Sequence, residues 1–314
     1  MRKVKFIVPL PDVFYYNWHL LPQINNFSKY GYDEDTHYLV GVFNNNASEN
    51  IRKMADSPKI NSKFHFYMDE RTEQERAYSA SLKPFLMYKY FQQHPWEKDC
   101  AYVYLDPDVI YLDKFDFTPF LDDDIWYGSD VGSYLDSNYI KQKGGDELLN
   151  EFCEQAGISP ELVIANDKNC IGAQYLTKNN TPEFWKDVYQ KSSKCYVYLN
   201  SRRDYFFRPE MTCWLQLWTN EMWLTIWQLW LNGIETKHTN EWCFHWGNHL
   251  QKDKAHKIFH NAGVADPNEQ FHFSKTAYQV SPFNKDIPTS QESLSYEYVK
   301  EIKEAEVAFP DLIW

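Results

Sequence analysis

Positive charge is scarce in this chain: 32 lysines and arginines stand against 44 aspartates and glutamates, which gives a formal net charge of −12. Binding to a nucleic-acid backbone depends on clustered lysines and arginines that neutralise phosphates. The charge balance therefore argues against a dedicated nucleic-acid-binding protein. A local basic cleft is compatible with it, so nucleic acid is an unexpected partner but not an excluded one.

Long apolar segments and paired cysteine motifs are also missing. The N-terminal MRKVKFIVPLP holds too few apolar residues before Pro9 for a signal peptide. The most hydrophobic window, Trp214–Leu231, is interrupted by polar and charged residues. The six cysteines are widely spaced and form no CxxC pair, which is typical of reduced thiols. We therefore expect a cytoplasmic protein without a membrane span.

Four common catalytic motifs are absent from the sequence: G-x-G-x-x-G, Walker A, H-E-x-x-H and G-x-S-x-G. The sequence therefore lacks the residues that the chemistry of dehydrogenases, P-loop NTPases, zinc proteases and α/β-hydrolases requires.

Aromatic residues are abundant, at 18% of 314 residues. This content argues against disorder and suits a core together with a cleft that stacks on sugars or bases. No linker rich in proline or serine divides the chain. We expect one compact domain of two fused halves, over about residues 1–115 and residues 116–285. A C-terminal helix would follow over residues 286–314.

The first half alternates strands with helices, which predicts an α/β fold with a mostly parallel, doubly wound central sheet flanked by helices. The expected strands are Lys3–Leu10, Thr36–Phe43, Lys63–Met68 and the run that begins at Ala101. The expected helices are Leu20–Phe27, Asn50–Ala55 and Ser79–Gln93, and Pro11–Trp18 is expected to be a loop.

The second half is less regular. We expect strands at Ile125–Ser129 and Asn169–Leu176, and helices at Pro182–Lys191, Glu210–Asn232 and Gln291–Ala308. The stretch Asp136–Asp167 is either a long irregular insert or contains a helix at Gly144–Gln155, and Arg202–Phe207 carries no clear pattern.

The most informative stretch is AYVYLDPDVIYL, which contains Asp106 and Asp108 on either side of Pro107. Ala101–Leu105 is apolar throughout, as in a buried strand, and Pro107 ends regular pairing because it has no N–H. Ligands of open α/β sheets bind at the carboxyl ends of strands. Two carboxylates one residue apart repel each other unless a cation compensates their charge, so the pair predicts a site for a hard divalent cation such as Mn2+ or Mg2+.

This D-x-D resembles the signature of nucleotide-sugar glycosyltransferases of the GT-A fold, which is Rossmann-like. The resemblance implies that the aspartates hold Mn2+ or Mg2+ against the diphosphate of the donor. Asp108 would be the firmer metal ligand, and Asp106 would contact both ribose and metal.

Two further segments resemble that family. Ser79–Tyr88 is similar to the helix before the D-x-D strand, whose basic residue approaches the nucleotide or sugar. Lys83 matches that residue, and Arg76 matches it less well. The run NCIGAQ is similar to the strand that lines the sugar pocket of retaining members, which implies a role for Gly172 and Gln174. An ordinary surface lysine and an ordinary strand glycine are the alternatives.

A late histidine is the expected third metal ligand. His260 in IFHNAGV resembles the third ligand of glycogenin-like enzymes, and Lys275 resembles their diphosphate-binding lysine. The H-x-G-x-x-K-P-W motif of that group is absent here. His245 and His249, four residues apart, and His272 are competing candidates, and a buried core histidine is the alternative for each.

Two carboxylates are candidates for acid–base work. Glu221 in TNEMW lies on an apolar segment, where an unpaired carboxylate is unfavourable, and the segment resembles part of the peptidyl serine galactosyltransferases. Asp130 follows an expected strand. A structural ion pair is the alternative for Glu221.

The resemblance therefore implies a metal-dependent glycosyltransferase that moves a hexose from a nucleoside diphosphate sugar, with UDP as the expected nucleotide, to an acceptor hydroxyl. It also implies a single catalytic domain in which residues 1–115 form the nucleotide-sugar-binding half and residues 116–285 the acceptor half. A retaining reaction is favoured over an inverting one. The acceptor stays open between glycan, protein, lipid headgroup and modified base. The alternatives are a nucleotidyltransferase, against which the missing glycine-rich loop counts, and a non-catalytic carbohydrate-binding protein on the same scaffold.

Overall fold

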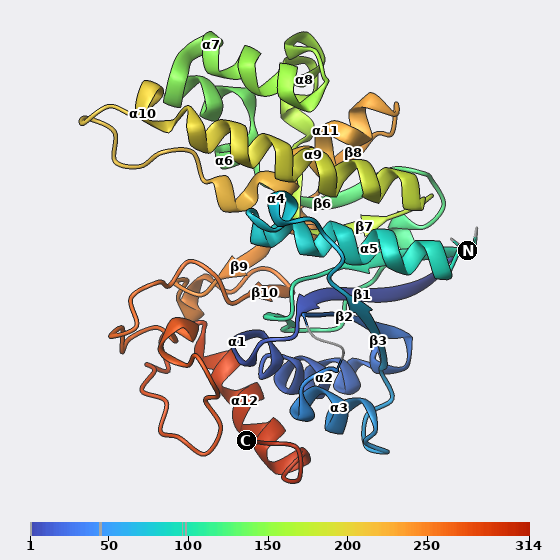
Figure 1. The fold of residues 1–314 in the computed structure, drawn as a ribbon. Helices are drawn as coiled ribbons and strands as arrows, with labels where there is room; N and C mark the ends of the chain where they lie inside the picture. Colours follow the sequence, from blue (N-terminus) through green and yellow to red (C-terminus); the bar gives the residue numbers. More distant parts are fainter. Residues whose placement is uncertain (1, 44–45, 96, 98) are drawn as a thin grey trace. The chain divides into compact units, whose positions relative to one another are not determined.

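The computed structural model describes residues 2–43, 46–95, 97 and 99–314 (Figure 1). Within it the chain forms two compact units. Unit 1 contains Asp69–Tyr102 and Phe120–Thr239 together with Arg2 and Lys3. Unit 2 contains Val4–Met68, Val103–Pro119 and Asn240–Trp314. Each unit is thus assembled from separate stretches of the chain, and the expected organisation as a single catalytic domain stays a prediction.

Unit 2 is built on three parallel strands in the order β3-β2-β1. Strand β1 (Lys3–Pro11) pairs with β2 (Thr36–Val42), which pairs with β3 (Lys63–Met68). Every residue of β2 is buried, as expected for an apolar central strand. The connecting helices are α1 (Phe14–Asn17), α2 (Leu20–Tyr30) and α3 (Glu49–Ala55). The segment predicted as a loop at Pro11–Trp18 therefore contains one short helix.

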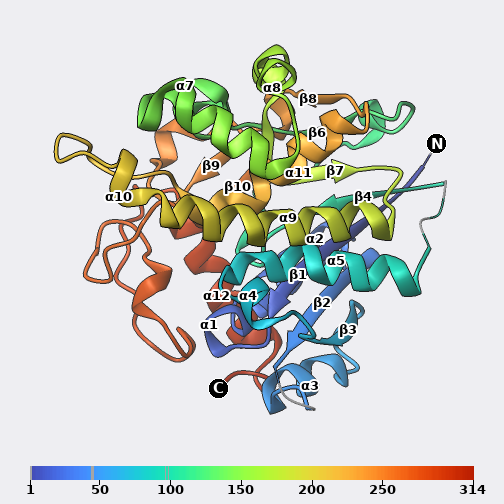
Figure 2. The same cartoon turned by 45° about the horizontal axis from the view of Figure 1, so that its top comes forward.

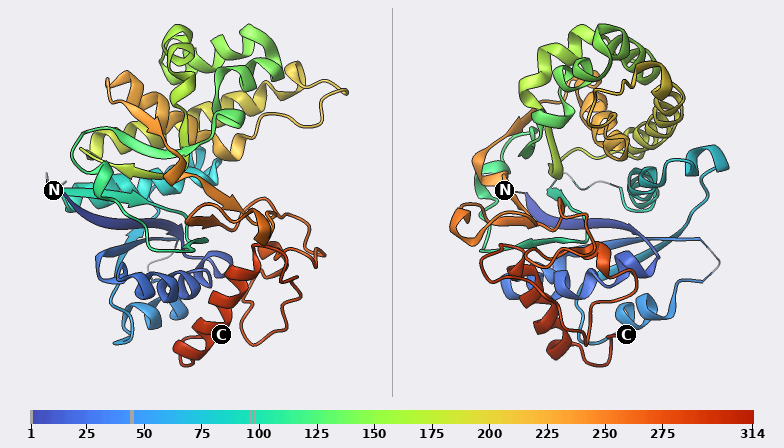
Figure 3. Two further views of the ribbon diagram at one scale, coloured as in Figure 1. Left: turned by 180° about the vertical axis from the view of Figure 1, so that it is seen from behind. Right: turned by 90° about the vertical axis from the view of Figure 1, so that its left-hand side faces the viewer.

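The C-terminal helix α12 (Tyr296–Ala308) lies beside α2 in unit 2, as the red and blue helices in Figure 3 show. It starts five residues later than the sequence pattern indicated. The Glu301 carboxylate fixes the pair of helices, because it accepts hydrogen bonds from Asn25 at 2.9 Å, Asn26 at 3.0 Å and Lys29 at 2.7 Å. These charge-assisted bonds compensate for the burial of the carboxylate.

A smaller sheet of unit 2 brings distant segments together. Strand β10 (Ile258–His260) pairs antiparallel with β5 (Val109–Tyr111) and parallel with β9 (Phe244–Trp246). His260 stands opposite Val109 in this register. Strand β4 (Cys100–Tyr104) comes before β5 in the chain. Directly after β4, Leu105 N–H donates to the Ile7 carbonyl of β1 at 3.1 Å, so the chain is hydrogen-bonded to β1 just before the D-x-D.

Unit 1 has three strands in the order β7-β6-β8. Strand β6 (Trp126–Asp130) pairs antiparallel with β7 (Ile171–Thr177) and parallel with β8 (Thr236–His238). The β6–β7 register shifts between Gly128 and Ser129, and Ala173 on the partner strand has a left-handed φ of 53°. Most strand pairs within the units are parallel and helices flank them, which confirms the predicted α/β class.

The helices of unit 1 are α4 (Glu73–Arg76), α5 (Leu82–Gln93), α6 (Gly132–Leu135), α7 (Ser137–Ala156), α8 (Pro160–Asn166), α9 (Pro182–Ser201), α10 (Arg203–Phe206) and α11 (Asn220–Leu231). Helices α5 and α9 lie side by side (Figure 2). Of the two alternatives for Asp136–Asp167, the irregular insert is wrong, because α7 and α8 fill the stretch, and the helix expected at Gly144–Gln155 lies within α7. Non-helical angles at Gly144 and Gly145 interrupt α7 and obscured its pattern.

The long helix predicted at Glu210–Asn232 is also wrong. Only its second half, α11, is an α-helix, and a 3-10 turn at Leu217–Thr219 precedes it. Gln216 has a ψ of 68°, which is incompatible with a helix, and its N–H donates to the Tyr139 hydroxyl at 3.1 Å. This tertiary hydrogen bond outweighs local helix propensity. Glu221 consequently lies in the first turn of α11.

Two further properties bear on the sequence predictions. None of the helices in the described part of the chain is long and apolar enough to cross a membrane. All six cysteines are free thiols, four of them buried.

Candidate active site

The D-x-D lies in unit 2, in the turn between β4 and β5. Val109 N–H donates to the Asp106 carbonyl at 3.3 Å and closes this turn. The Gln23 side-chain amide, from α2, donates to the carbonyls of Asp106 and Val109, both at 2.9 Å. Gln23 is fully buried. The backbone that carries the two aspartates is therefore clamped from both sides of the turn.

His260 completes a group with the two aspartates. Its Nε2 lies 3.3 Å from Asp108 Oδ1 and 3.7 Å from Asp106 Oδ2, and the three groups offer ligand atoms within 4.8 Å of one another. Asn261 N–H donates to the Asp108 carbonyl at 3.0 Å, which ties β10 to the D-x-D turn. The pairing of β10 with β5 thus places His260 beside residues that lie more than 150 positions earlier.

The competing histidines lie in other environments. His245 Nδ1 is 3.1 Å from His249 Nδ1, and His245 Nε2 accepts from the N–H groups of Ala255 and His256, both at 2.9 Å. His272 Nδ1 is 2.8 Å from Ser293 Oγ. The structure therefore separates these histidines by their partners: His260 faces the carboxylates, and the others make structural hydrogen bonds.

Lys275 is the fourth member of the group in unit 2, because its Nζ contacts Asp108 Oδ2. Burial would raise the pKa of Asp108, but Lys275 and His260 outweigh burial and hold this pKa well below its usual range. Burial would lower the pKa of Lys275, and Asp108 reverses that effect, so the pKa of Lys275 is raised. The pair is therefore fully ionised at neutral pH.

The donor set could hold a divalent cation. Two carboxylates and one imidazole nitrogen are available within a small volume, and the Asp106 side chain keeps 22% of its surface exposed. Oxygen-rich sets suit Mg2+ and Mn2+, and an imidazole ligand shifts the preference towards transition metals.

Two residues near this group had only a weak sequence signal. Burial raises the pKa of the Tyr15 hydroxyl. The Lys275 charge lowers this pKa and the Asp108 charge raises it, both by less than burial does. His19 is fully buried and its Nδ1 is 2.7 Å from the Tyr298 hydroxyl, and burial lowers its pKa to about 3. Both residues follow β1 in the chain. Because the carboxyl ends of parallel strands lie at the same edge of a sheet, this position is the sequence feature that could have indicated their place near the D-x-D.

A second polar group lies in unit 1. The Glu221 carboxylate is buried, with Oε1 at 2.9 Å from Lys83 Nζ and Oε2 in contact with the Tyr78 hydroxyl. Burial, followed by the Glu221 charge, raises the pKa of Tyr78 well above its usual range, so the phenol is neutral and donates. Lys83 is thereby held by a carboxylate that is itself hydrogen-bonded.

The other predicted residues of unit 1 gather at the β6–β7 bulge. Gln174 is buried and donates to Ser129 Oγ at 2.7 Å, and Asp130 is exposed and accepts from Gly132 N–H at 2.9 Å. Gly172 packs against α11, since a Cβ there would lie 2.6 Å from Met222 Cε. The candidate residues therefore fall into two groups, one in each unit, and their functional roles stay predictions.

Comparisons with known proteins are sparse at the level of sequence: no protein-family model matches the chain, and no curated protein sequence matches it. Among solved structures, the chain is similar to the galactosyltransferase LgtC in complex with donor and acceptor sugar analogues, with a TM-score of 0.44 and 13% identity over 96% of this chain and 95% of that one. It is also similar to the apo-form glycosyltransferase GlyE of Streptococcus pneumoniae TIGR4, with a TM-score of 0.46 and 9% identity over 99% of this chain and 63% of that one. A structural similarity at these TM-scores identifies neither a substrate nor the role of any residue in this chain.

Proposed function

We propose that this protein is a metal-dependent glycosyltransferase that moves a sugar from a nucleoside diphosphate sugar to an acceptor hydroxyl. The observation that carries the proposal is the convergence of Asp106, Asp108 and His260 beside Lys275 in unit 2. Two carboxylates and an imidazole suit Mn2+ or Mg2+, and a lysine in the same place suits a diphosphate.

Each residue of unit 2 has a distinct part in this proposal. Asp108 and His260 bind the cation, and Asp106, with its more exposed carboxylate, contacts both cation and ribose. When bound, the cation supplies Lewis-acid stabilisation of the charge that develops on the departing diphosphate. Lys275 adds positive charge to the same diphosphate, and Gln23 keeps the D-x-D turn in place.

We assign the residues of unit 1 to the sugar side of the reaction. Both oxygens of Glu221 are engaged, one by Lys83 and one by Tyr78. This engagement makes Glu221 a support for Lys83 more readily than a base for the acceptor, and it favours a retaining reaction. The Gln174 and Gly172 segment, with its left-handed Ala173, would line the sugar pocket. If the reaction inverts instead, Asp130 is the exposed carboxylate of this group.

The test is thermal unfolding of metal-free protein to which Mn2+ and then UDP, GDP, CDP or ADP are added. A ligand at a hundred times its Kd stabilises the native state by about 2.7 kcal/mol, which corresponds to a rise of roughly 4 °C in Tm for a chain of this length, at about 2 cal/mol/K of unfolding entropy per residue. We expect a metal-dependent shift with one nucleotide, UDP first.

Asp108→Asn should abolish that shift. Asp113→Asn is the matched control, because Asp113 is an exposed carboxylate just beyond β5 with a side chain that is 70% exposed. An equal shift in wild type and Asp108→Asn, or no shift with any nucleotide, would refute the proposal.

A further inference from the structure

Strand β5 is the outer strand of its small sheet in the described part of the chain, because its partner β10 lies between it and β9. All three residues of β5 are buried. On the paired edge the Asp108 carbonyl, just before β5, accepts from the Asn261 N–H at 3.0 Å. Backbone groups of a strand alternate between its two edges, and buried ones need partners on both. The second edge of β5 therefore requires partners from outside the sheet.

Side-chain amides of α2 take the place of a neighbouring strand at this second edge. Asn26 Nδ2 donates to the Tyr111 carbonyl at 2.9 Å, and Asn26 Oδ1 accepts from the Tyr111 N–H at 2.8 Å. Gln23, one turn earlier on α2, donates to the carbonyls of Asp106 and Val109. Asn26 is 1% exposed and Gln23 is fully buried. The loss of either amide would leave buried backbone groups without a partner, which is costly.

Helix α12 holds α2 in register with β5. The Glu301 carboxylate accepts from Asn26 Nδ2 at 3.0 Å, and the same nitrogen donates to the Tyr111 carbonyl. An amide nitrogen carries two hydrogens, so Asn26 can serve both acceptors. The hydroxyl of Tyr298, one turn before Glu301, lies 2.7 Å from Nδ1 of the buried His19, which directly precedes α2. A continuous set of hydrogen bonds thus runs from α12 through α2 to the backbone of β5.

This set of hydrogen bonds ends on the backbone that carries the candidate metal ligands. Asp106 and Asp108 lie in the turn before β5, and His260 stands opposite Val109 as the last residue of β10. The ligand atoms of the three residues lie within 4.8 Å of one another. Their spacing depends on where β5 lies between β10 and α2. Hydrogen bonds around a metal site orient its ligands and change its affinity in this way.

We propose that Asn26 and Glu301 are positioning residues of the metal group. They act through the backbone of β5, and neither belongs to the Asp106–Asp108–His260 group. The C-terminal helix α12 thereby contributes to cation affinity through α2. The inference rests on the proposed metal-dependent function and adds to it the residues that set the affinity for the cation. The alternative is that these hydrogen bonds serve only the stability of unit 2.

The experiment measures the affinity for Mn2+ by isothermal titration, together with the Tm of the metal-free protein. Asn26→Asp keeps the size of the side chain and the acceptor for the Tyr111 N–H. It removes the donor to the Tyr111 carbonyl and places a second carboxylate against Glu301. The variant should bind Mn2+ about tenfold or more weakly than wild type. At saturating Mn2+ its electron spin-echo signal should still show a bound nitrogen, because His260 is unchanged.

Glu301 gives a second variant and a rescue. Glu301→Gln keeps the size of the side chain but removes its charge, and it should weaken Mn2+ binding several-fold. It also carries the test if Asn26→Asp does not fold. The double variant Asn26→Asp/Glu301→Gln restores a donor and an acceptor between the two side chains in the reverse direction. It should therefore recover part of the affinity that Asn26→Asp loses.

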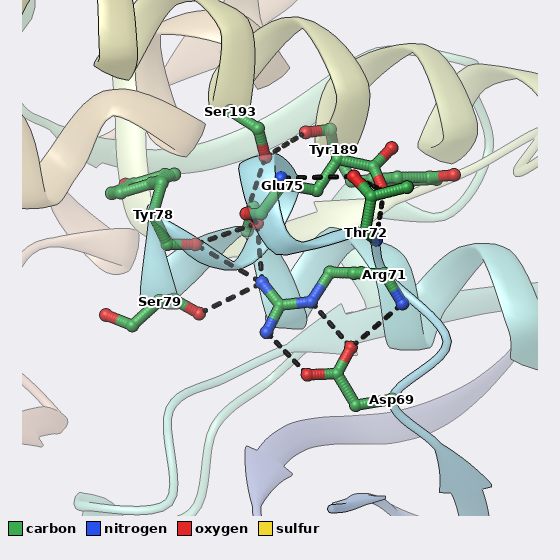
Figure 4. A network of polar contacts seen from close by, with 9 residues as sticks. Asp69, Arg71, Thr72, Glu75, Tyr78, Ser79, Tyr189 and Ser193 are labelled. Atoms are coloured by element: carbon green, nitrogen blue, oxygen red, sulfur yellow. Dashed lines mark hydrogen bonds and ion pairs between the residues drawn. The ribbon is translucent and has the colours of Figure 1, made fainter.

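A buried carboxylate of unit 1 provides the matched control. Asp69 accepts two hydrogen bonds from Arg71, at 2.8 and 2.9 Å, and Arg71 Nη1 donates to the Tyr78 carbonyl at 3.2 Å (Figure 4). Asp69→Asn is the same exchange of carboxylate for amide as Glu301→Gln, in a buried network outside unit 2. It should lower Tm and leave the affinity for Mn2+ unchanged.

Three results would count against the inference. Wild-type affinity for Mn2+ in the folded variants of Asn26 and Glu301 would overturn it, because the hydrogen bonds would then serve stability alone. An equal loss of affinity in Asp69→Asn would overturn it as well, because the effect would not be specific to β5. If the wild-type protein binds no Mn2+, both this inference and the proposed function are refuted, so the two failures are distinguishable.

Discussion

The contact between Lys275 and Asp108 predicts an unusual pair of opposite effects. A divalent cation held by Asp108 competes with the Lys275 ammonium for the same carboxylate. Replacement of Lys275 by Met should therefore strengthen binding of the cation alone. The same replacement should weaken binding of a nucleoside diphosphate to the cation-loaded protein, because the ammonium would otherwise contact the diphosphate.

The magnitude follows from the geometry of the pair. Asp108 is almost fully buried and the Lys275 side chain is 22% exposed, so water screens their attraction only in part. A hydrogen bond between charged groups contributes roughly 1.5–3 kcal/mol, and each 1.4 kcal/mol corresponds to about tenfold in affinity. Lys275→Met should thus bind Mn2+ about tenfold more tightly and bind UDP–Mn2+ at least about tenfold more weakly.

Isothermal titration measures both affinities, first with Mn2+ alone and then with UDP at saturating Mn2+. Lys275→Arg retains the charge and should resemble wild type in both titrations. Lys257→Met is the matched control, since Lys257 pairs with the exposed Asp113 at 3.5 Å in the same unit. If Lys275→Met weakens both ligands, or changes neither, Lys275 does not share Asp108 with the cation and the reasoning fails.

Three further predictions concern stability and can be read from thermal unfolding. Gly172→Ala should lower stability by about 1–3 kcal/mol, because its Cβ would lie 2.9 Å from Cγ2 of Val131, a β-branched side chain with little rotamer freedom. An unchanged Tm would show that Val131 can move away. Arg71→Met should destabilise unit 1 by about 3–5 kcal/mol because it leaves Asp69 buried without its partner, and the double variant with Asp69→Asn should recover part of the loss. Burial, with smaller contributions from neighbouring histidines, lowers the pKa of His245 from 6.5 to about 4, so the native state prefers the neutral ring and loses stability as the pH falls from 6.5 towards 4. His245→Gln should flatten that slope, and an equal slope in both proteins would contradict the assignment.

The parts of the fold that the sequence predicts well are those with strong local patterns. Strand β3 matches the prediction residue for residue, because alternating aromatic residues between turn signals are a distinctive pattern. The D-x-D was placed correctly at the end of a buried strand, because Pro107 marks the point where pairing stops.

The parts that failed depend on contacts between distant residues. Helix α11 begins ten residues later than expected, because Gln216 is held in a non-helical conformation by Tyr139. The choice of His260 over His245 follows from the register of β10 with β5, which no local pattern reveals. The exposure of Trp218 cannot be predicted from its residue type, because it depends on the surrounding structure.

The partners of Glu221 also depend on contacts between residues that are distant in the sequence. The sequence indicates that a carboxylate on an apolar segment needs a partner, and the structure identifies Lys83 and Tyr78 as the partners. Lys83 and Glu221 were each candidates, but their mutual contact spans more than 130 positions of the chain. Such pairs are visible only once α5 and α11 are placed within unit 1.

The central claim is that Asp106, Asp108 and His260 hold one divalent cation, and electron spin-echo spectroscopy of bound Mn2+ tests it most directly. A nitrogen bound to Mn2+ modulates the echo, and His260 Nε2 is the nitrogen that faces the two carboxylates. The account predicts one tightly bound Mn2+ per chain with a nitrogen modulation that disappears in His260→Gln and persists in His245→Gln. A bound Mn2+ without nitrogen modulation, or a modulation that survives in His260→Gln, would contradict it.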